Sequence, residues 1–216
     1  MENAKDLAKD MLSSLGLENQ GLLVAYVKGL VSFPVNLYYL SYDFIHTDDR
    51  GRNMDDNMRL AKLLHRATTE KNINFIAQAI DVFIRDFMNH VNIEEILKQT
   101  AENNLASALG NYTFGELTGV KMARLITSKI VFSIAFSMSI NVLLMIGGGA
   151  SRAIHESRLL ALRNHIMYIK LKQLGGLDLL YFVIKDRVNP FEKAVKLAKD
   201  NPLLFNKAAE YFFKGL

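Results

Sequence analysis

Apolar residues recur at steps of three and four along nearly the whole chain, and no stretch alternates apolar and polar residues over the length of a strand. This pattern predicts an all-α protein. The clearest stripe of core-facing residues falls in 72–91 and consists of Ile73, Ile76, Ala77, Ile80, Phe83, Ile84 and Phe87. Helices are expected over residues 4–15, 21–33, 54–70, 72–91, 93–108, 113–147, 152–173 and 177–187, with an exposed polar loop at 46–53.

Residue types that begin helices mark several further boundaries. Thr113 and Glu116 have the spacing of a capping box, in which each side chain bonds to the backbone of the other residue. Ser151 is placed to cap the helix that follows a run of glycines. Pro190 and Pro202 each follow an asparagine, and proline is favoured at the first position of a helix. We therefore expect two last helices, one beginning at each proline.

The segment 130–150 contains 21 consecutive residues without a charge. As a helix it would be about 31 Å long, which matches the hydrocarbon core of a bilayer. A helix that is apolar on all sides must be buried, either in lipid or at the centre of a globule. The sequence thus predicts a multi-helix bundle with one long central apolar helix, and both locations of that helix remain open.

Polar residues recur at four-residue steps along this segment and share one side of a helix within about 120°. Such a face either packs closely against another helix or, in an oligomer, lines a path for water and ions. The glycine run that ends the segment would suit a hinge. The candidate pore or packing face is Lys129, Ser133, Ser137 and Asn141, and the candidate hinge is Gly147, Gly148 and Gly149.

The formal net charge of +4 is distributed unevenly. Residues 1–120 hold 11 Lys and Arg against 16 Asp and Glu, whereas residues 121–216 hold 15 against 6. We expect a single helical domain over 1–216, with an acidic half at 1–111 and a basic half at 112–216. Because the basic half is also the more apolar one, it favours anionic lipid over nucleic acid as a partner. The expected membrane-surface cations are Arg152, Arg158, Arg163, Lys193, Lys196 and Lys199.

Motifs for catalysis are missing from the sequence. It has no cysteine, no glycine-rich phosphate loop and no HExxH or GxSxG pattern. The strongest acidic group surrounds His46, but Asp55 and Asp56 fit the start of a helix and Asp48 and Asp49 fit a turn. We therefore expect no enzyme activity, no cofactor and no metal. The alternative hypothesis, a hydrolase or cation site, would use Asp43, Asp48, Asp49, Asp55 and Asp56.

A cysteine-free helical chain with one long uncharged helix between basic amphipathic helices resembles bacterial pore-forming toxins. Among these toxins, the chain resembles colicin-like channel domains and the small ion-selective effectors of type VI secretion. The features that carry the resemblance are segment 130–150, its terminal glycines and the basic helices 152–173 and 190–213. The chain departs from colicin channels, which end in an apolar helical hairpin of nearly twice this length.

The resemblance implies a protein that inserts into the inner membrane of a rival cell and depolarises it. The implied partners are the lipid membrane, further copies of the chain when inserted, and a cognate immunity protein. Residues 1–6 do not resemble a Sec signal, so we expect synthesis in the bacterial cytoplasm and action at an inner membrane, that of a target cell after secretion. The alternative is a soluble all-helical binding module, such as an immunity or adaptor protein, with 130–150 as its central helix.

Overall fold

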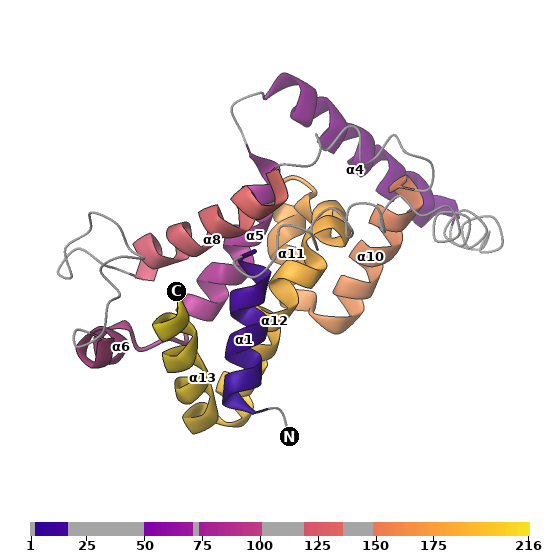
Figure 1. The fold of residues 1–216 in the computed structure, drawn as a ribbon. Helices are drawn as coiled ribbons and strands as arrows, with labels where there is room; N and C mark the ends of the chain where they lie inside the picture. Colours follow the sequence, from indigo (N-terminus) through magenta and orange to yellow (C-terminus); the bar gives the residue numbers. More distant parts are fainter. Residues whose placement is uncertain (1–2, 17–49, 71–73, 101–118, 136–148) are drawn as a thin grey trace. The chain divides into compact units, whose positions relative to one another are not determined.

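The structure is a computed structural model, and it describes residues 3–16, 50–70, 74–100, 119–135 and 149–216 (Figure 1). Every element in these ranges is helical, which confirms the all-α prediction for them. The predicted long apolar helix stays a prediction, because residues 136–148 lie outside these ranges. The elements are α1 (Ala4–Ser14), α4 (Arg50–Thr69), α5 (Phe75–Met88), α6 (Ile93–Thr100), α8 (Gly119–Ala135), α10 (Gly149–Arg163), α11 (His165–Gln173), the 3₁₀ helix η3 (Leu177–Leu180), α12 (Tyr181–Asp200) and α13 (Pro202–Gly215).

None of the helices in the described ranges has the length and apolar character needed to cross a bilayer. The chain divides into two compact units. Unit 1 consists of Met1–Gln20, Ile80–Ser133 and Asp186–Leu216, and unit 2 consists of Gly21–Ala79 and Ile134–Lys185. Each unit therefore contains residues from both the acidic and the basic half of the sequence.

In unit 1, α1 and α13 pack against each other. Both contribute small buried residues, which let two helix backbones approach closely. Arg187 fixes the end of α1, because its Nη1 donates to the main-chain oxygens of Ser13 and Ser14 at 3.3 and 3.1 Å. Main-chain oxygens in the last turn of a helix lack partners from a following turn, and that of Ser13 also accepts from the nitrogen of Gly16 at 3.0 Å. The buried residues are Ala4, Leu7, Ala8, Met11 and Ser14 on α1, and Phe205, Ala208, Ala209, Phe212 and Phe213 on α13.

Five phenylalanines form the aromatic core of unit 1 around Phe87 of α5. The ring centroid of Phe87 lies 5.4 Å from that of Phe191 and 5.9 Å from those of Phe205 and Phe212, all in edge-to-face geometry. Phe213 stacks on the same ring at 6.4 Å. Both arrangements are favourable for aromatic pairs. The ring of Phe87 is thus enclosed by side chains of α12 and α13.

The stripe predicted within residues 72–91 is largely confirmed. Asn74 accepts a hydrogen bond from the main-chain nitrogen of Ala77 at 2.9 Å, so α5 begins at Phe75 and not at residue 72. Ala77 is only half-buried, and Ile73 lies outside the described residues. The stripe members that are buried are Ile76, Ile80, Phe83, Ile84 and Phe87.

The two predicted proline starts have different outcomes. Asn201 accepts a bond from the main-chain nitrogen of Leu204 at 3.1 Å, and Pro202 is the first residue of α13, as predicted. The prediction for Pro190 is wrong, because Pro190 lies inside α12. Proline in a helix interior costs about 3 kcal/mol, mainly through a lost hydrogen bond. Burial of the adjacent Phe191 offsets this cost.

Four further boundaries differ from the sequence prediction. The predicted loop 46–53 is wrong at residues 50–53, which belong to α4, because polar composition does not distinguish a loop from a solvated helical turn. Ser151 is buried inside α10 and is therefore not its N-cap. The predicted helix 152–173 is broken at Asn164, whose side chain accepts from the nitrogen of Met167 at 3.3 Å and starts α11. The predicted helix 177–187 is η3 followed by the first turns of α12.

Candidate functional site

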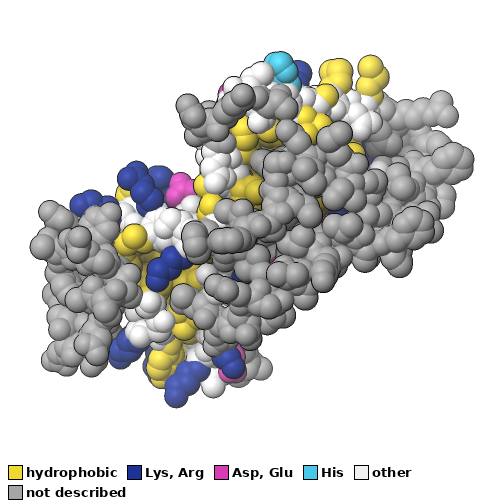
Figure 2. Space-filling model, turned by 45° about the horizontal axis from the view of Figure 1, so that its top comes forward, with side chains coloured by type: hydrophobic (Ala, Val, Ile, Leu, Met, Phe, Trp, Pro, Cys, Tyr) yellow, Lys and Arg dark blue, Asp and Glu magenta, His cyan; other side chains and the backbone are white. Residues whose placement is uncertain are grey.

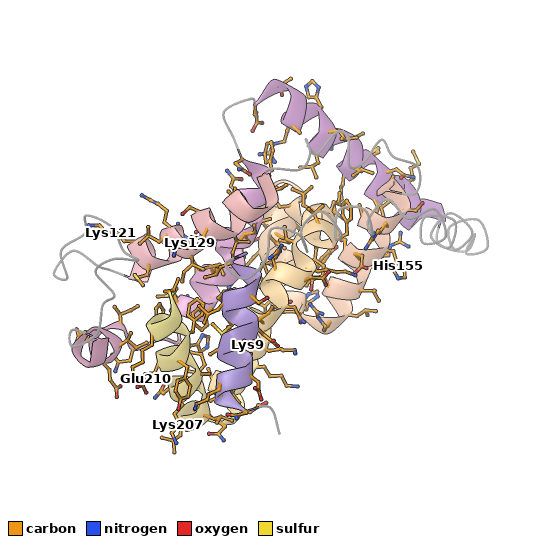
Figure 3. All side chains as sticks on the ribbon, viewed as in Figure 1. Lys9, Lys121, Lys129, His155, Lys207 and Glu210 are labelled. Atoms are coloured by element: carbon orange, nitrogen blue, oxygen red, sulfur yellow. The ribbon has the colours of Figure 1, made fainter. Side chains whose placement is uncertain are left out.

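The predicted pore or packing face begins on α8. Lys129 is half-buried, and its Nζ lies 3.4 Å from the main-chain oxygen of Leu216 (Figure 3). Ser133 follows one turn later on α8. Ser137 and Asn141 lie outside the described residues, as do Gly147 and Gly148. Gly149 is buried and is the first residue of α10.

The first half of α8 is anchored in unit 1. Its apolar face is buried, whereas Arg124 and Ser128 on the other side are exposed. Thr127 also faces the core, where its hydroxyl donates to a carboxylate oxygen of Asp81 at 3.5 Å. Helix α8 is therefore amphipathic, and it is packed in unit 1 as far as Ile130, the first residue of segment 130–150. The buried residues of this face are Met122, Ala123, Ile126 and Ile130.

The six predicted membrane-surface cations differ in their exposure and in their bonding partners. Arg158 donates to Oδ2 of Asp56 from Nε at 3.0 Å and from Nη2 at 2.8 Å, so an ion pair within unit 2 holds its side chain. Arg163 is exposed, donates to the hydroxyl of Tyr181 and has its guanidinium 5.4 Å from the centroid of that ring. Arg152 is half-buried on α10, and Lys193, Lys196 and Lys199 are exposed on α12. On the face drawn in Figure 2, Lys and Arg colour more of the described surface than Asp and Glu.

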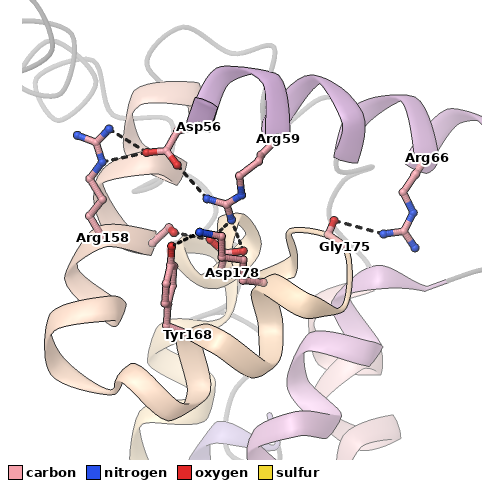
Figure 4. Close-up of polar contacts among 9 residues, drawn as sticks. Asp56, Arg59, Arg66, Arg158, Tyr168, Gly175 and Asp178 are labelled. Atoms are coloured by element: carbon pink, nitrogen blue, oxygen red, sulfur yellow. Dashed lines mark hydrogen bonds and ion pairs between the residues drawn. The ribbon is translucent and has the colours of Figure 1, made fainter. Parts of the chain in front are cut away.

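Buried and half-buried charged side chains gather around Asp178 inside unit 2 (Figure 4). Asp178 has 0% exposure, accepts bonds from Nη2 of Arg59 on both carboxylate oxygens, and accepts one from the hydroxyl of Ser157 at 2.5 Å. Arg59 also donates from Nη1 to Asp56 at 2.8 Å. Asp56 in turn accepts from Arg158. We call these five residues, Asp56, Arg59, Ser157, Arg158 and Asp178, the Asp178 network.

Arg59 carries a positive charge throughout the usual pH range. Partial burial by itself lowers the pKa of its guanidinium, but the hydrogen bond and charge of Asp178 outweigh this effect, with smaller contributions from Tyr168 and Asp56. The net result is a pKa raised above the ordinary value for arginine. A raised pKa stabilises the fold at all pH values below the unfolded-state pKa, and for arginine these include the whole usual pH range. The Arg59 side of the network is therefore insensitive to pH under working conditions.

The Asp178 network connects helices. Its residues come from α4, α10 and η3, so the ion pairs hold these three elements together. Ser157 donates to a carboxylate whose two oxygens also accept from Arg59, so its hydroxyl is held inside the network. Of the acidic group considered in the sequence, Asp56 belongs to this network and Asp55 is exposed, while Asp43, Asp48 and Asp49 lie outside the described residues. Within the described residues, no group of three or more His, Asp or Glu could hold a metal ion.

The sequence itself indicates that Asp178 is unusual, although no catalytic motif contains it. Asp178 is the single charge within the apolar run 177–184 and follows two glycines. A lone acid in such a run is buried with the rest of the run and needs a cationic partner there. Nearby, Glu156 is also buried and accepts from Nζ of Lys185 at 2.5 Å. The partners themselves lie far away in sequence, so periodicity cannot identify them.

Gly175 provides a test of the turn beside this network. Its φ of 89° is unfavourable for residues other than glycine. An added Cβ would also collide with the guanidinium of Arg66. That guanidinium donates to the main-chain oxygens of Leu174 and Gly175 at 3.2 and 3.3 Å. We expect Gly175→Ala to lower the free energy of unfolding by about 1–3 kcal/mol. Gly176→Ala is the control, because Gly176 has a similar φ of 86° but more space. Thermal denaturation followed by circular dichroism should show the larger loss for Gly175→Ala; equal losses would contradict a role for the Arg66 contact.

The resemblance to pore-forming toxins concerns the order of apolar and basic segments along the chain, and it does not involve a shared motif. Of the segments that carry it, the structure describes the first residues of 130–150 on α8 and the basic helices α10 to α13. No protein-family model matches the chain, and no curated protein or solved structure is similar to it.

Proposed function

We propose that this protein inserts segment 130–150 into a bacterial inner membrane and depolarises that membrane by ion leakage. The observation that carries the proposal is the run of 21 uncharged residues, long enough to span the hydrocarbon core. Basic residues flank it on both sides, with Lys129 on α8 before it and Arg152 on α10 after it. Such residues favour the headgroup regions of a bilayer at the two ends of a spanning helix.

Conduction would require more than one copy of the segment. A single helix cannot enclose an aqueous path, so the polar residues Ser133, Ser137 and Asn141 would have to face one another in an oligomer. Their small side chains also permit the close helix contacts that stabilise such an assembly. The anchored first half of α8 would remain with unit 1, while the following uncharged residues enter the lipid.

Ion flux into liposomes tests this proposal. Full-length protein is added to vesicles of phosphatidylglycerol and phosphatidylethanolamine that contain potassium and a larger trapped dye, with a potential-sensitive dye outside. We expect a change in membrane potential without release of the trapped dye, because a narrow pore passes ions only. Failure of folded protein to change the potential at several pH values would contradict the proposal and favour the soluble binding module.

Ser137→Arg tests whether the segment itself conducts. An arginine near the middle of a spanning helix costs at least about 2.5 kcal/mol per copy, so we expect flux to fall at least tenfold. The matched control is Ser128→Arg, which places the same residue at an exposed position of α8 before the uncharged run. Circular dichroism checks that both variants fold. Flux that is equal in Ser137→Arg and wild type, or lost equally in both variants, would contradict a role for this face.

A further inference from the structure

The joint between α10 and α11 exposes large apolar side chains. Asn164 is the single residue between the two helices, and its non-helical backbone turns the chain there (Figure 1). Leu162, just before the joint, is 84% exposed, and Ile166, just after it, is 61% exposed. Leu159, one turn earlier on α10, is 45% exposed. Side chains of this size are usually covered, and three of them lie within eight residues of one another.

The surroundings of these side chains are basic. Residues 150–176 contain five Lys and Arg but only one acid, Glu156. That acid is buried and bonded to Lys185, so it presents no negative charge beside the joint. Arg163 and Lys170 are exposed, and Lys170 follows Ile166 by one helical turn. The exposed positions thus combine apolar side chains with positive charge.

We infer that the elbow surface, formed by Leu159, Leu162, Arg163, Ile166 and Lys170, docks the protein onto an anionic lipid bilayer. The inference rests on the proposed function, because it supplies the contact that brings segment 130–150 to the membrane. Charge complementarity selects this occupant: the apolar side chains enter the boundary between headgroups and acyl chains, and the cations meet lipid phosphates. The apolar side chains stand beside a sharp chain turn, a position from which they can reach into a bilayer.

Vesicle pelleting tests the docking surface separately from ion flux. Full-length protein is mixed with sucrose-loaded vesicles of phosphatidylglycerol and phosphatidylethanolamine, and with vesicles of phosphatidylcholine alone. We expect binding to the anionic vesicles that weakens as salt is raised, and much weaker binding to the neutral ones. Leu162→Asp should reduce the partition coefficient by about tenfold or more, since it removes apolar area and adds a negative charge. Ile166→Asp should act in the same direction.

Two matched variants control for general effects of the substitutions. Leu203 on α13 is 78% exposed, so Leu203→Asp makes the same chemical change at a similarly exposed site in unit 1. Lys170→Glu should weaken binding to anionic vesicles, whereas Lys9→Glu on α1, also at an exposed lysine, should leave it within about twofold of wild type. All these residues are exposed, so thermal unfolding should be unchanged.

The outcomes separate the docking surface from the proposed function. Binding that Leu162→Asp removes and Leu203→Asp retains supports the elbow surface, and Ser137→Arg should keep this binding while it loses flux. Wild-type binding through the elbow surface without any flux would overturn the proposed function alone. The docking role of the elbow surface is contradicted if Leu162→Asp binds anionic vesicles like wild type, or if Leu203→Asp loses as much binding as Leu162→Asp. It is also contradicted if folded wild-type protein binds no anionic vesicle. The last result would favour an acidic protein as the occupant.

Discussion

Replacing Asp178 with alanine is expected to lower the free energy of unfolding of unit 2 by about 3–5 kcal/mol. Asp178 is fully buried and accepts bonds from both Arg59 and Ser157. Its removal leaves the guanidinium of Arg59 without its main counter-charge, and the Arg59 side chain is only 19% exposed. It also leaves the Ser157 hydroxyl without an acceptor. An unpaired charge that cannot return fully to water is a large penalty, whereas the intact pair contributes little net stability.

Scanning calorimetry of the full-length protein measures this effect. Asp55→Ala is the control: it removes the same charged group from an exposed position of α4, and we expect a change within about 0.5 kcal/mol. The double variant Arg59→Leu with Asp178→Leu removes both charges and should recover much of the loss. A loss below about 1 kcal/mol for Asp178→Ala would show that the Asp178 network does not hold unit 2 together, and no recovery in the double variant would contradict an unpaired buried charge as the cause of the loss.

Phe87→Ala is expected to lower the free energy of unfolding of unit 1 by about 3–5 kcal/mol. The ring of Phe87 has 0% exposure and contacts four other phenylalanine rings, with centroids 5.4 to 6.4 Å away. Alanine would leave a cavity between α5, α12 and α13 that these rings cannot fill without leaving their own positions. The loss therefore combines the transfer free energy of the ring with the cost of the cavity.

Urea denaturation followed by far-ultraviolet circular dichroism checks the Phe87 prediction. Phe87→Leu is the matched control, because leucine keeps much of the volume, and we expect it to cost about 1.5 kcal/mol or less. The two substitutions should therefore differ by at least about 1.5 kcal/mol in the free energy of unfolding. A loss below about 1.5 kcal/mol for Phe87→Ala would show that the aromatic cluster has little influence on the stability of unit 1, and equal losses for alanine and leucine would contradict the cavity as the cause.

Local sequence signals predicted the helices well where neighbouring residues decide them. The stripe of residues 72–91 became α5 because apolar residues at helical spacing need one common buried face. Asn201 and Pro202 began α13 because a cap needs only a side chain and a backbone nitrogen three residues apart. Pro190 was predicted wrongly, since the burial that keeps α12 continuous there comes from residues distant in sequence.

The candidate site was predictable only in part, for the same reason. The uncharged run 130–150 and its polar residues can be read directly from the order of residues. Arg158 was expected at a membrane surface because its helix is basic, but the structure pairs it with Asp56, 102 residues away. The elbow surface was not predicted, because periodicity continues through Asn164 and gives no sign that the helix ends there.

The sequence by itself determined that the described part of this protein is helical, that its second half is basic, and that residues 130–150 form a run of 21 without a charge. These properties depend on residue type and spacing along the chain, which periodicity and composition report directly. Only the tertiary structure decided which charges are paired in the Asp178 network and which apolar side chains remain exposed beside Asn164. Burial and pairing depend on contacts between residues far apart in sequence, and these arise only when the chain has folded.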